Sequence, residues 1–146
     1  MTDRVNINEV QPGAFKAMFA VERYLSSAEL STTLKELIKV RASQINGCAY
    51  CIAMHTESAL KNGESQERLF ELATWRESNL FSGQERAVLE LTDEITRISE
   101  HGLSQETYTA ASQALGNNVL AEAIVQVAAI NSWNRIAVAT QMEYRP

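Results

Sequence analysis

A chain of 146 residues with 45% hydrophobic content can bury one sizeable core, so we expect a single domain over residues 1–146. The 18 Asp and Glu outnumber the 13 Lys and Arg, and no basic cluster stands out, which argues against nucleic acid as a partner. The amino terminus lacks the layout of a secretory signal, and no apolar run approaches the roughly 18 residues of a membrane span. We therefore expect a soluble, cytoplasmic protein with no membrane partner.

Apolar residues recur at helical spacing along most of the chain, and no segment shows the alternation that is typical of a strand. Proline occurs only at Pro12 and Pro146, and the six glycines mostly separate the apolar stretches. The pattern predicts an all-α fold of about six to seven helices. The expected helices cover about residues 14–26, 31–46, 48–62, 65–73, 82–101, 104–115 and 119–141.

Three of these boundaries carry local signals. Asn46-Gly47 is typical of a helix end, Ser82 to Glu85 fits a capping box that starts a helix, and Gly116 separates the last two helices. The final helix is apolar on more than one side, which predicts a position at the centre of the fold or against another subunit. We accordingly expect a homo-oligomer.

The two cysteines of the chain lie three residues apart, in the segment Cys48-Ala49-Tyr50-Cys51. A disulfide between them would stabilise the fold little, because that stabilisation decreases as the closed loop becomes shorter. Redox chemistry or metal binding therefore explains the pair better than structural cross-linking. If a helix begins at Cys48, its unpaired N–H groups and its dipole stabilise a thiolate. We expect a reactive thiol with a lowered pKa.

His55 lies four residues after Cys51 and seven after Cys48, so the three side chains project along one face of a helix. The imidazole can accept a thiol proton or pair with the thiolate, and Tyr50 can add a hydroxyl group between the cysteines. We therefore take Cys51, Cys48 and His55 as candidate catalytic residues, with Tyr50 in a supporting role.

Glu36 lies on the preceding expected helix, twelve residues before Cys48. The pattern of Glu36, eleven residues, Cys48, two residues, Cys51, three residues and His55 resembles the core motif of the alkylhydroperoxidase D-like and carboxymuconolactone decarboxylase-like family. Residues 41–55, RASQINGCAYCIAMH, are similar to the most recognisable block of that family. Four functional residue types in register make the resemblance specific.

The resemblance implies antiparallel helices, assembly into trimers or hexamers, and a peroxidase that reduces organic hydroperoxides or hydrogen peroxide. It implies that Cys51 is the attacking thiolate. Cys48, the more exposed partner, then forms a disulfide that an external thiol or dithiol reduces. Glu36 and His55 would form the proton relay, which makes Glu36 a fourth candidate catalytic residue. We expect no cofactor and no metal.

One position departs from the family pattern, because better-studied relatives carry a histidine where this chain has Tyr50. A phenol is a poor base at neutral pH, so the relay must run without it or be weaker. Two alternatives therefore stay open. The first is a thiol-disulfide oxidoreductase without efficient peroxidase activity. The second is a non-catalytic thiol sensor or zinc module, whose ligands would be Cys48, Cys51, His55 and a fourth residue such as Glu36 or His101.

Overall fold

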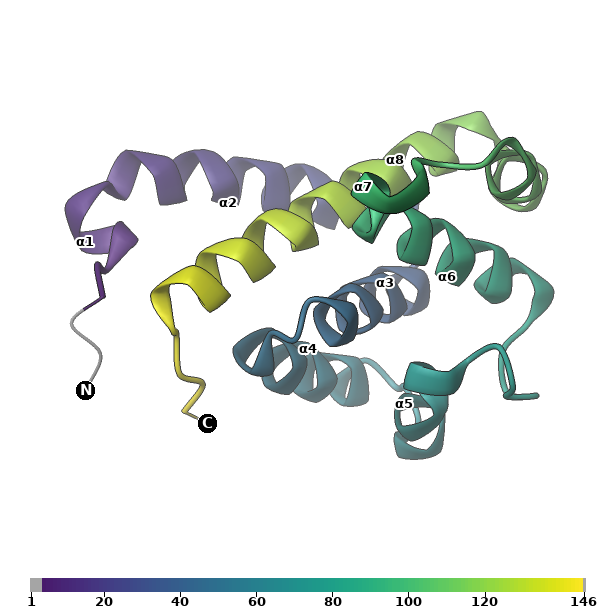
Figure 1. Ribbon diagram of the computed structural model, residues 1–146, viewed down its shortest axis with the longest axis horizontal. Helices are drawn as coiled ribbons and strands as arrows, with labels where there is room; N and C mark the ends of the chain where they lie inside the picture. Colours follow the sequence, from purple (N-terminus) through teal and green to yellow (C-terminus); the bar gives the residue numbers. More distant parts are fainter. Residues whose placement is uncertain (1–3, 146) are drawn as a thin grey trace.

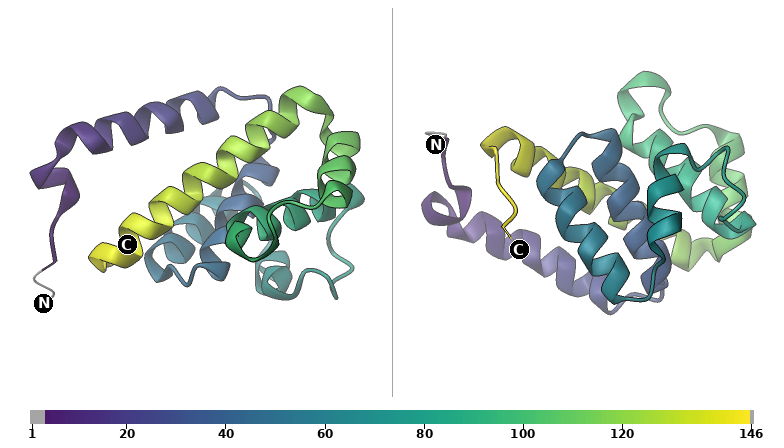
Figure 2. Two further views of the ribbon diagram at one scale, coloured as in Figure 1. Left: turned by 45° about the horizontal axis from the view of Figure 1, so that its top comes forward. Right: turned by 90° about the horizontal axis from the view of Figure 1, so that it is seen from below.

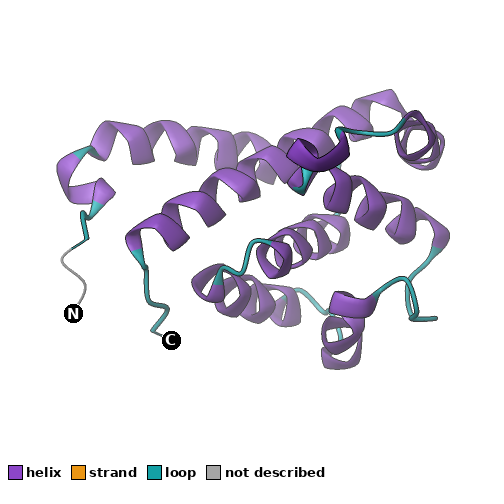
Figure 3. Ribbon diagram, in the orientation of Figure 1, coloured by secondary structure: helices purple, strands orange, loops and turns teal. Residues whose placement is uncertain are grey.

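The computed structural model describes residues 4–145, and helices with their connecting loops make up that part of the chain (Figure 3). In chain order the elements are α1 Ile7–Val10, α2 Pro12–Ser26, α3 Thr32–Ile45, α4 Ala49–Lys61, α5 Gln66–Glu71, the 3-10 turn η1 Leu72–Thr74, α6 Gly83–Thr96, α7 Ile98–His101 and α8 Gln105–Thr140. The predicted all-α class is confirmed. Within residues 4–145, no helix is both long and apolar enough to cross a membrane.

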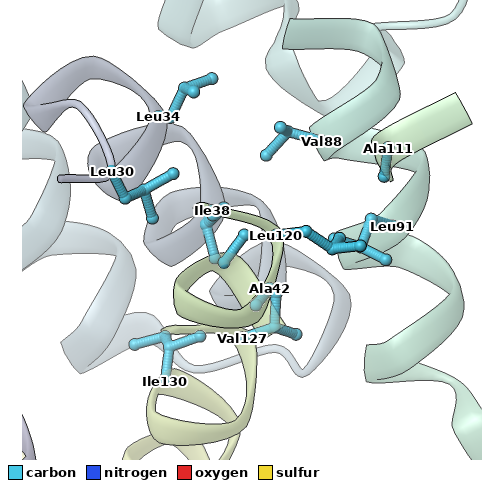
Figure 4. Close-up of a cluster of buried hydrophobic side chains, with 11 residues drawn as sticks. Leu30, Leu34, Ile38, Ala42, Val88, Leu91, Ala111, Leu120, Val127 and Ile130 are labelled. Atoms are coloured by element: carbon cyan, nitrogen blue, oxygen red, sulfur yellow. The ribbon is translucent and has the colours of Figure 1, made fainter. Parts of the chain in front are cut away.

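Helix α3 lies at the centre of the molecule and packs against α4, α6 and α8. Figure 1 shows α3 and α4 lying side by side, with α6 and α8 above them. A buried cluster joins α3 to α6 and α8 (Figure 4), and it includes Leu34, Ile38, Val88, Leu91 and Val127. Removing this apolar surface from water stabilises the arrangement and fixes the position of α3.

The helix starts follow their capping residues. At the predicted capping box, the Ser82 side chain accepts a hydrogen bond from the N–H of Glu85, and the Glu85 carboxylate accepts one from the N–H of Ser82. Ser31, Ser65 and Ser104 also cap the helices that they precede, each accepting from a backbone N–H three residues on. These bonds satisfy amide groups that have no partner inside the helix.

Two features differ from the predicted helices. The helix expected over residues 82–101 is interrupted at Arg97, where a ψ of 34° leaves the helical region and separates α6 from α7. The short helix α1, capped by Asn6, precedes Pro12 and has no counterpart in the prediction. The break expected at Gly116 is present inside α8. Its φ of 75° and ψ of 159° are non-helical, and the chain changes direction there.

The carboxy-terminal part of α8 packs against α2, α3 and other helices of the same chain, which accounts for its apolar character. Helix α2 runs along the outer edge of the molecule (Figure 2). Trp133 of α8 holds it there, because the indole N–H donates to Glu22 at 2.9 Å and the ring contacts Phe15 and Phe19. These contacts place α2 beside the candidate site.

Candidate active site

The turn between α3 and α4 places both cysteines at a helix start, as predicted. Gly47 adopts a φ of 63°, a left-handed conformation that glycine reaches without steric cost, and the N–H of Cys48 donates to the carbonyl of Ser43 at 3.0 Å. Cys48 is the residue that caps α4, and its Sγ accepts a hydrogen bond from the N–H of Cys51 at 3.2 Å. The sulfurs therefore lie at the positive end of the helix dipole.

Polar side chains from α8 hold this turn in place. The amide nitrogen of Asn46 donates to the side-chain oxygens of Asn131 and Asn134, both at 2.9 Å, and Asn134 in turn donates to the hydroxyl of Ser43 at 3.0 Å. Asn134 is fully buried, so water cannot replace a lost partner. Removing any of these hydrogen bonds would therefore leave a buried polar group unpaired, which destabilises the fold. The network ties the cysteine turn to the centre of the fold.

The two cysteine sulfurs are bonded to each other in this structure. Each cysteine is only 1% exposed, and both pack against Ala137, Tyr50 and Met142. The expectation that Cys48 is the more exposed partner is therefore wrong for this chain, because side chains of α4, α8 and the carboxy-terminal segment cover both sulfurs. The difference between the cysteines lies elsewhere: Cys51 lines a pocket, and Cys48 is not among the residues around it.

A pocket of about 340 Å³ opens beside Cys51. Helices α2, α3, α4 and α8 form its walls, together with the carboxy-terminal segment. Its apolar lining consists of Phe15, Phe19, Met54, Ile130, Trp133, Ala137 and Met142, and its polar lining consists of Glu22, Lys39, Tyr50, His55 and Gln126. Pockets of this size are typical of small-molecule sites.

His55 lines the same pocket as Cys51, which is the arrangement expected from their spacing on α4. Burial, and to a smaller extent the nearby positive charge of Lys39, together lower the pKa of His55 to about 4. The imidazole is therefore neutral at physiological pH and can accept a proton. Its environment in this structure contains the cysteines as a disulfide, which carries no charge.

Glu36 is buried on α3, only 4% exposed, but it does not line the pocket. Its Oε1 accepts hydrogen bonds from Lys39 at 2.9 Å and from Ser58 at 3.1 Å. Its Oε2 has no hydrogen-bond partner among residues 4–145. Glu36 and His55 are thus not in direct contact through a hydrogen bond here. Lys39 is the residue between them, since it bonds to Glu36 and lines the pocket with His55.

Lys39 is not among the site residues that the sequence predicts. A lysine three residues after a glutamate on a predicted helix has the spacing of an ordinary surface ion pair. The burial of Glu36 is what makes the pair unusual, and that burial follows from the packing of α3 against α4. The only sequence feature that could have identified Lys39 is its position on the same helix face as the motif residue Glu36.

Tyr50 borders both the pocket and the carboxy-terminal segment. Its ring makes an edge-to-face contact with Tyr144 at 5.9 Å between centroids, and the hydroxyl of Tyr144 hydrogen-bonds to Glu57. This contact, together with Met142, holds the carboxy-terminal segment over the start of α4. Tyr50 therefore contributes to covering the disulfide. His101 is exposed on α7 and is not among the pocket residues, and the described residues contain no cluster of three metal-binding side chains.

Comparison with known proteins agrees with the motif and the fold. The model of the Carboxymuconolactone decarboxylase family matches residues 12–94, which include the whole motif. An uncharacterised protein of Bacillus subtilis, YdfG, is 38% identical over 139 residues, or 95% of each chain.

Solved structures extend this agreement to nearly the whole chain. A protein of unknown function from Agrobacterium tumefaciens, suggested to be the antioxidant defence protein AhpD, is 36% identical and superposes with a TM-score of 0.96 over 99% of each chain. An uncharacterised peroxidase-related protein from Ralstonia eutropha with an alkylhydroperoxidase AhpD core has the same fold. It is 20% identical, with a TM-score of 0.82 over 94% of this chain and 74% of its own. The chain described here belongs to the carboxymuconolactone decarboxylase family, in its AhpD-like structural group.

Proposed function

We propose that this protein is a thiol-dependent peroxidase that reduces hydroperoxides through Cys51 and Cys48. The observation that carries the proposal is the joint position of Cys51 and the neutral His55 on one small-molecule pocket, with Cys48 bonded to Cys51 from the preceding turn. A nucleophile, a base within the same pocket and a resolving thiol are the parts that such a reaction needs.

The cycle starts from the reduced protein. The thiolate of Cys51 attacks the terminal oxygen of a hydroperoxide, an S–O bond forms, the O–O bond breaks, and the alcohol leaves after it takes up a proton. Cys51 is then a sulfenic acid. The thiol of Cys48 attacks its sulfur, water leaves, and the disulfide seen in this structure forms. An external thiol or dithiol supplies the two electrons that restore both thiols.

The side chains around Cys51 support the proton movements of this cycle. His55 would accept the thiol proton of Cys51 and return it to the leaving alkoxide. The positive charge of Lys39 lies near His55 and would stabilise the thiolate. In this scheme Glu36 acts through Lys39, which it holds by a hydrogen bond of 2.9 Å. The role of Glu36 is therefore to position Lys39.

A steady-state peroxide assay with a small dithiol as reductant tests the proposal. Wild-type protein should consume the hydroperoxide, and Cys51→Ser should lose that activity entirely. Cys48→Ser should reduce about one equivalent of hydroperoxide and then stop at a sulfenic acid, which a carbon nucleophile such as dimedone can trap. Wild-type activity in Cys51→Ser would exclude Cys51 as the attacking group.

The burial of the disulfide bears on the alternative of a thiol-disulfide oxidoreductase. Thiol-disulfide exchange with a protein substrate requires the disulfide of that protein to contact one of the two cysteine sulfurs. Both cysteines are only 1% exposed, so a large partner cannot reach them in this structure. This burial favours a small hydroperoxide as the oxidant and a small thiol as the reductant. A parallel insulin-reduction assay separates the two activities, and we expect it to show little exchange.

A further inference from the structure

The pocket beside Cys51 contains one buried polar group that the proposed reaction does not use. Gln126 of α8 lines the pocket and is 2% exposed, and its Nε2 has no hydrogen-bond partner among residues 4–145. A buried amide is normally hydrogen-bonded, since an unpaired one has lost its water without replacement. An unpaired donor at the edge of a cavity is the state expected of a group whose partner is a ligand.

The charged groups Glu22 and Lys39 of the pocket lining already have hydrogen-bond partners. Glu22 accepts from the indole N–H of Trp133 at 2.9 Å, and Lys39 donates to Glu36 at 2.9 Å. Gln126 therefore differs from both, and its amide is the better candidate for contact with a neutral ligand. A neutral amide also fits a neutral ligand oxygen without burying a charge.

The rest of the lining indicates what that ligand is made of. Phe15, Trp133 and Ile130 give the pocket an apolar wall from two helices, and Met54 adds a flexible thioether side chain. A volume of about 340 Å³ corresponds to roughly eleven times the volume of a water molecule in the liquid. Hydrogen peroxide would leave nearly all of this apolar surface unfilled, whereas a compact hydrocarbon group would fill it.

We propose that the pocket binds an aryl or branched alkyl hydroperoxide of about ten non-hydrogen atoms, with Gln126 as the residue that donates a hydrogen bond to an oxygen of the ligand. The hydrocarbon group packs on the apolar wall, and the oxygen-bearing end lies in the part of the pocket that Cys51 and His55 share. Gln126 thus determines specificity. As a statement about the substrate, this inference rests on the proposed peroxidase function, but the binding itself can be tested without turnover.

The binding test uses the disulfide form of the full chain, which is the form described here, and 2-phenyl-2-propanol, the alcohol product of cumene hydroperoxide. Cumene, which lacks the hydroxyl group, serves as the matched ligand. Calorimetry or ligand-observed NMR should show saturable binding of both. Gln126→Met keeps the side-chain length and removes the amide, so it should weaken binding of the alcohol about 3- to 10-fold and leave cumene unchanged.

Gln44→Met is the matched control variant. Gln44 on α3 also carries a buried amide atom without a hydrogen-bond partner among residues 4–145, but it does not line the pocket. This variant should bind both ligands as wild type does. Met54→Trp fills the pocket from α4 and should abolish binding of both ligands, which keeps the test informative if Gln126→Met does not fold.

Kinetics then separate this inference from the proposed function. With peroxidase turnover established, kcat/KM for cumene hydroperoxide should exceed that for hydrogen peroxide at least 10-fold in wild type, and Gln126→Met should reduce that preference. Ligand binding without any turnover would contradict the peroxidase function and leave the ligand site standing. Turnover with no preference, or equal losses of alcohol and cumene binding in Gln126→Met, would overturn the assignment of Gln126.

Discussion

At the scale of single residues, the neutral state of His55 has the most direct consequence for the chemistry. Burial and the charge of Lys39 hold its pKa at about 4 while the cysteines form a disulfide. A thiolate on Cys51 would add an opposite charge to the same pocket and raise the pKa of His55. His55 therefore becomes a stronger base once the Cys51 thiolate has formed.

This account predicts two different titrations of His55. NMR of the imidazole protons of His55 should give a pKa of about 4 in the disulfide form and a higher value after reduction. Lys39→Met should raise the pKa of His55 in the disulfide form, because it removes a nearby positive charge. An identical pKa in both redox states would show that no thiolate forms near His55.

The same shift makes folding stability depend on pH. The unfolded chain protonates His55 near pH 6.5, whereas the folded chain does so only near pH 4. The contribution to stability is therefore complete above about pH 6.5 and is lost as the pH falls toward 4, by at most about 3 kcal/mol. In urea unfolding, His55→Gln should show a smaller loss of stability over this range than wild type. An unchanged pH dependence in His55→Gln would contradict the assignment of this loss to His55.

At the scale of elements, a buried ion pair joins α3 to α6. The guanidinium of Arg41 donates two hydrogen bonds to Asp93, at 2.7 Å and 2.9 Å, and Asp93 is 2% exposed. Burial alone would raise the pKa of Asp93, but the hydrogen bonds and charges of Arg41 and Arg76 hold it below its ordinary value. Because Arg41 and Glu36 lie on one helix, this pair also fixes the helix that carries Lys39.

Asp93→Asn should destabilise the protein by about 3–5 kcal/mol, because it leaves the buried guanidinium of Arg41 without its carboxylate. Chemical denaturation measures the loss. Glu90→Gln is the control, since the Arg76–Glu90 pair is largely solvent-exposed and should contribute less than about 1 kcal/mol. Equal effects of the two substitutions would contradict the structural role given to the buried pair.

The elements that could be predicted from the sequence are those with local signals. Ser82 and Gly116 act on their own backbone, so their patterns are sufficient to place a helix start and a break. The interruption at Arg97 has no such signal, because no apolar, glycine or proline pattern marks it. Helix α1 depends on Asn6 at a position without the apolar periodicity on which the other helices were predicted.

The residues of the candidate site also fall into those that local sequence spacing predicts and those that depend on helix packing. Cys48, Cys51 and His55 lie on one helix, so helical spacing alone brings them together. The contact of Lys39 with Glu36 and its place beside His55 depend on the burial of α3. Gln126 is a polar residue in a long apolar helix, a signal that could have been noted, but its place in the pocket that Cys51 also lines follows only from the packing of four helices.

At the scale of the whole molecule, the apolar face left on α2 supports assembly. Val21 and Tyr24 lie three residues apart on one side of α2 and are 38% and 50% exposed, although the apolar character of α8 is explained within the chain. Exposed apolar patches of this kind mark protein interfaces. The expected homo-oligomer, a trimer or hexamer, therefore rests on α2 and on the family resemblance.

Size-exclusion chromatography with light scattering should show an oligomer for wild-type protein. Tyr24→Glu places a charge on the α2 face outside the pocket and should shift the population toward monomer. Phe70→Glu changes a residue of α5 that is more exposed, at 74%, and should leave the oligomer unchanged. A wild-type protein that is monomeric at all concentrations would contradict the assignment of the α2 face.

The central claim is that Cys51 is oxidised by a hydroperoxide and resolved by Cys48. Mass spectrometry of a single turnover tests it most directly, with reduced protein and one equivalent of cumene hydroperoxide. We predict that wild type loses two hydrogens as the disulfide forms, and that Cys48→Ser gains one oxygen, which peptide mapping places on Cys51. Oxygen on another residue, or a reduced pair that survives the hydroperoxide unchanged, would contradict the account.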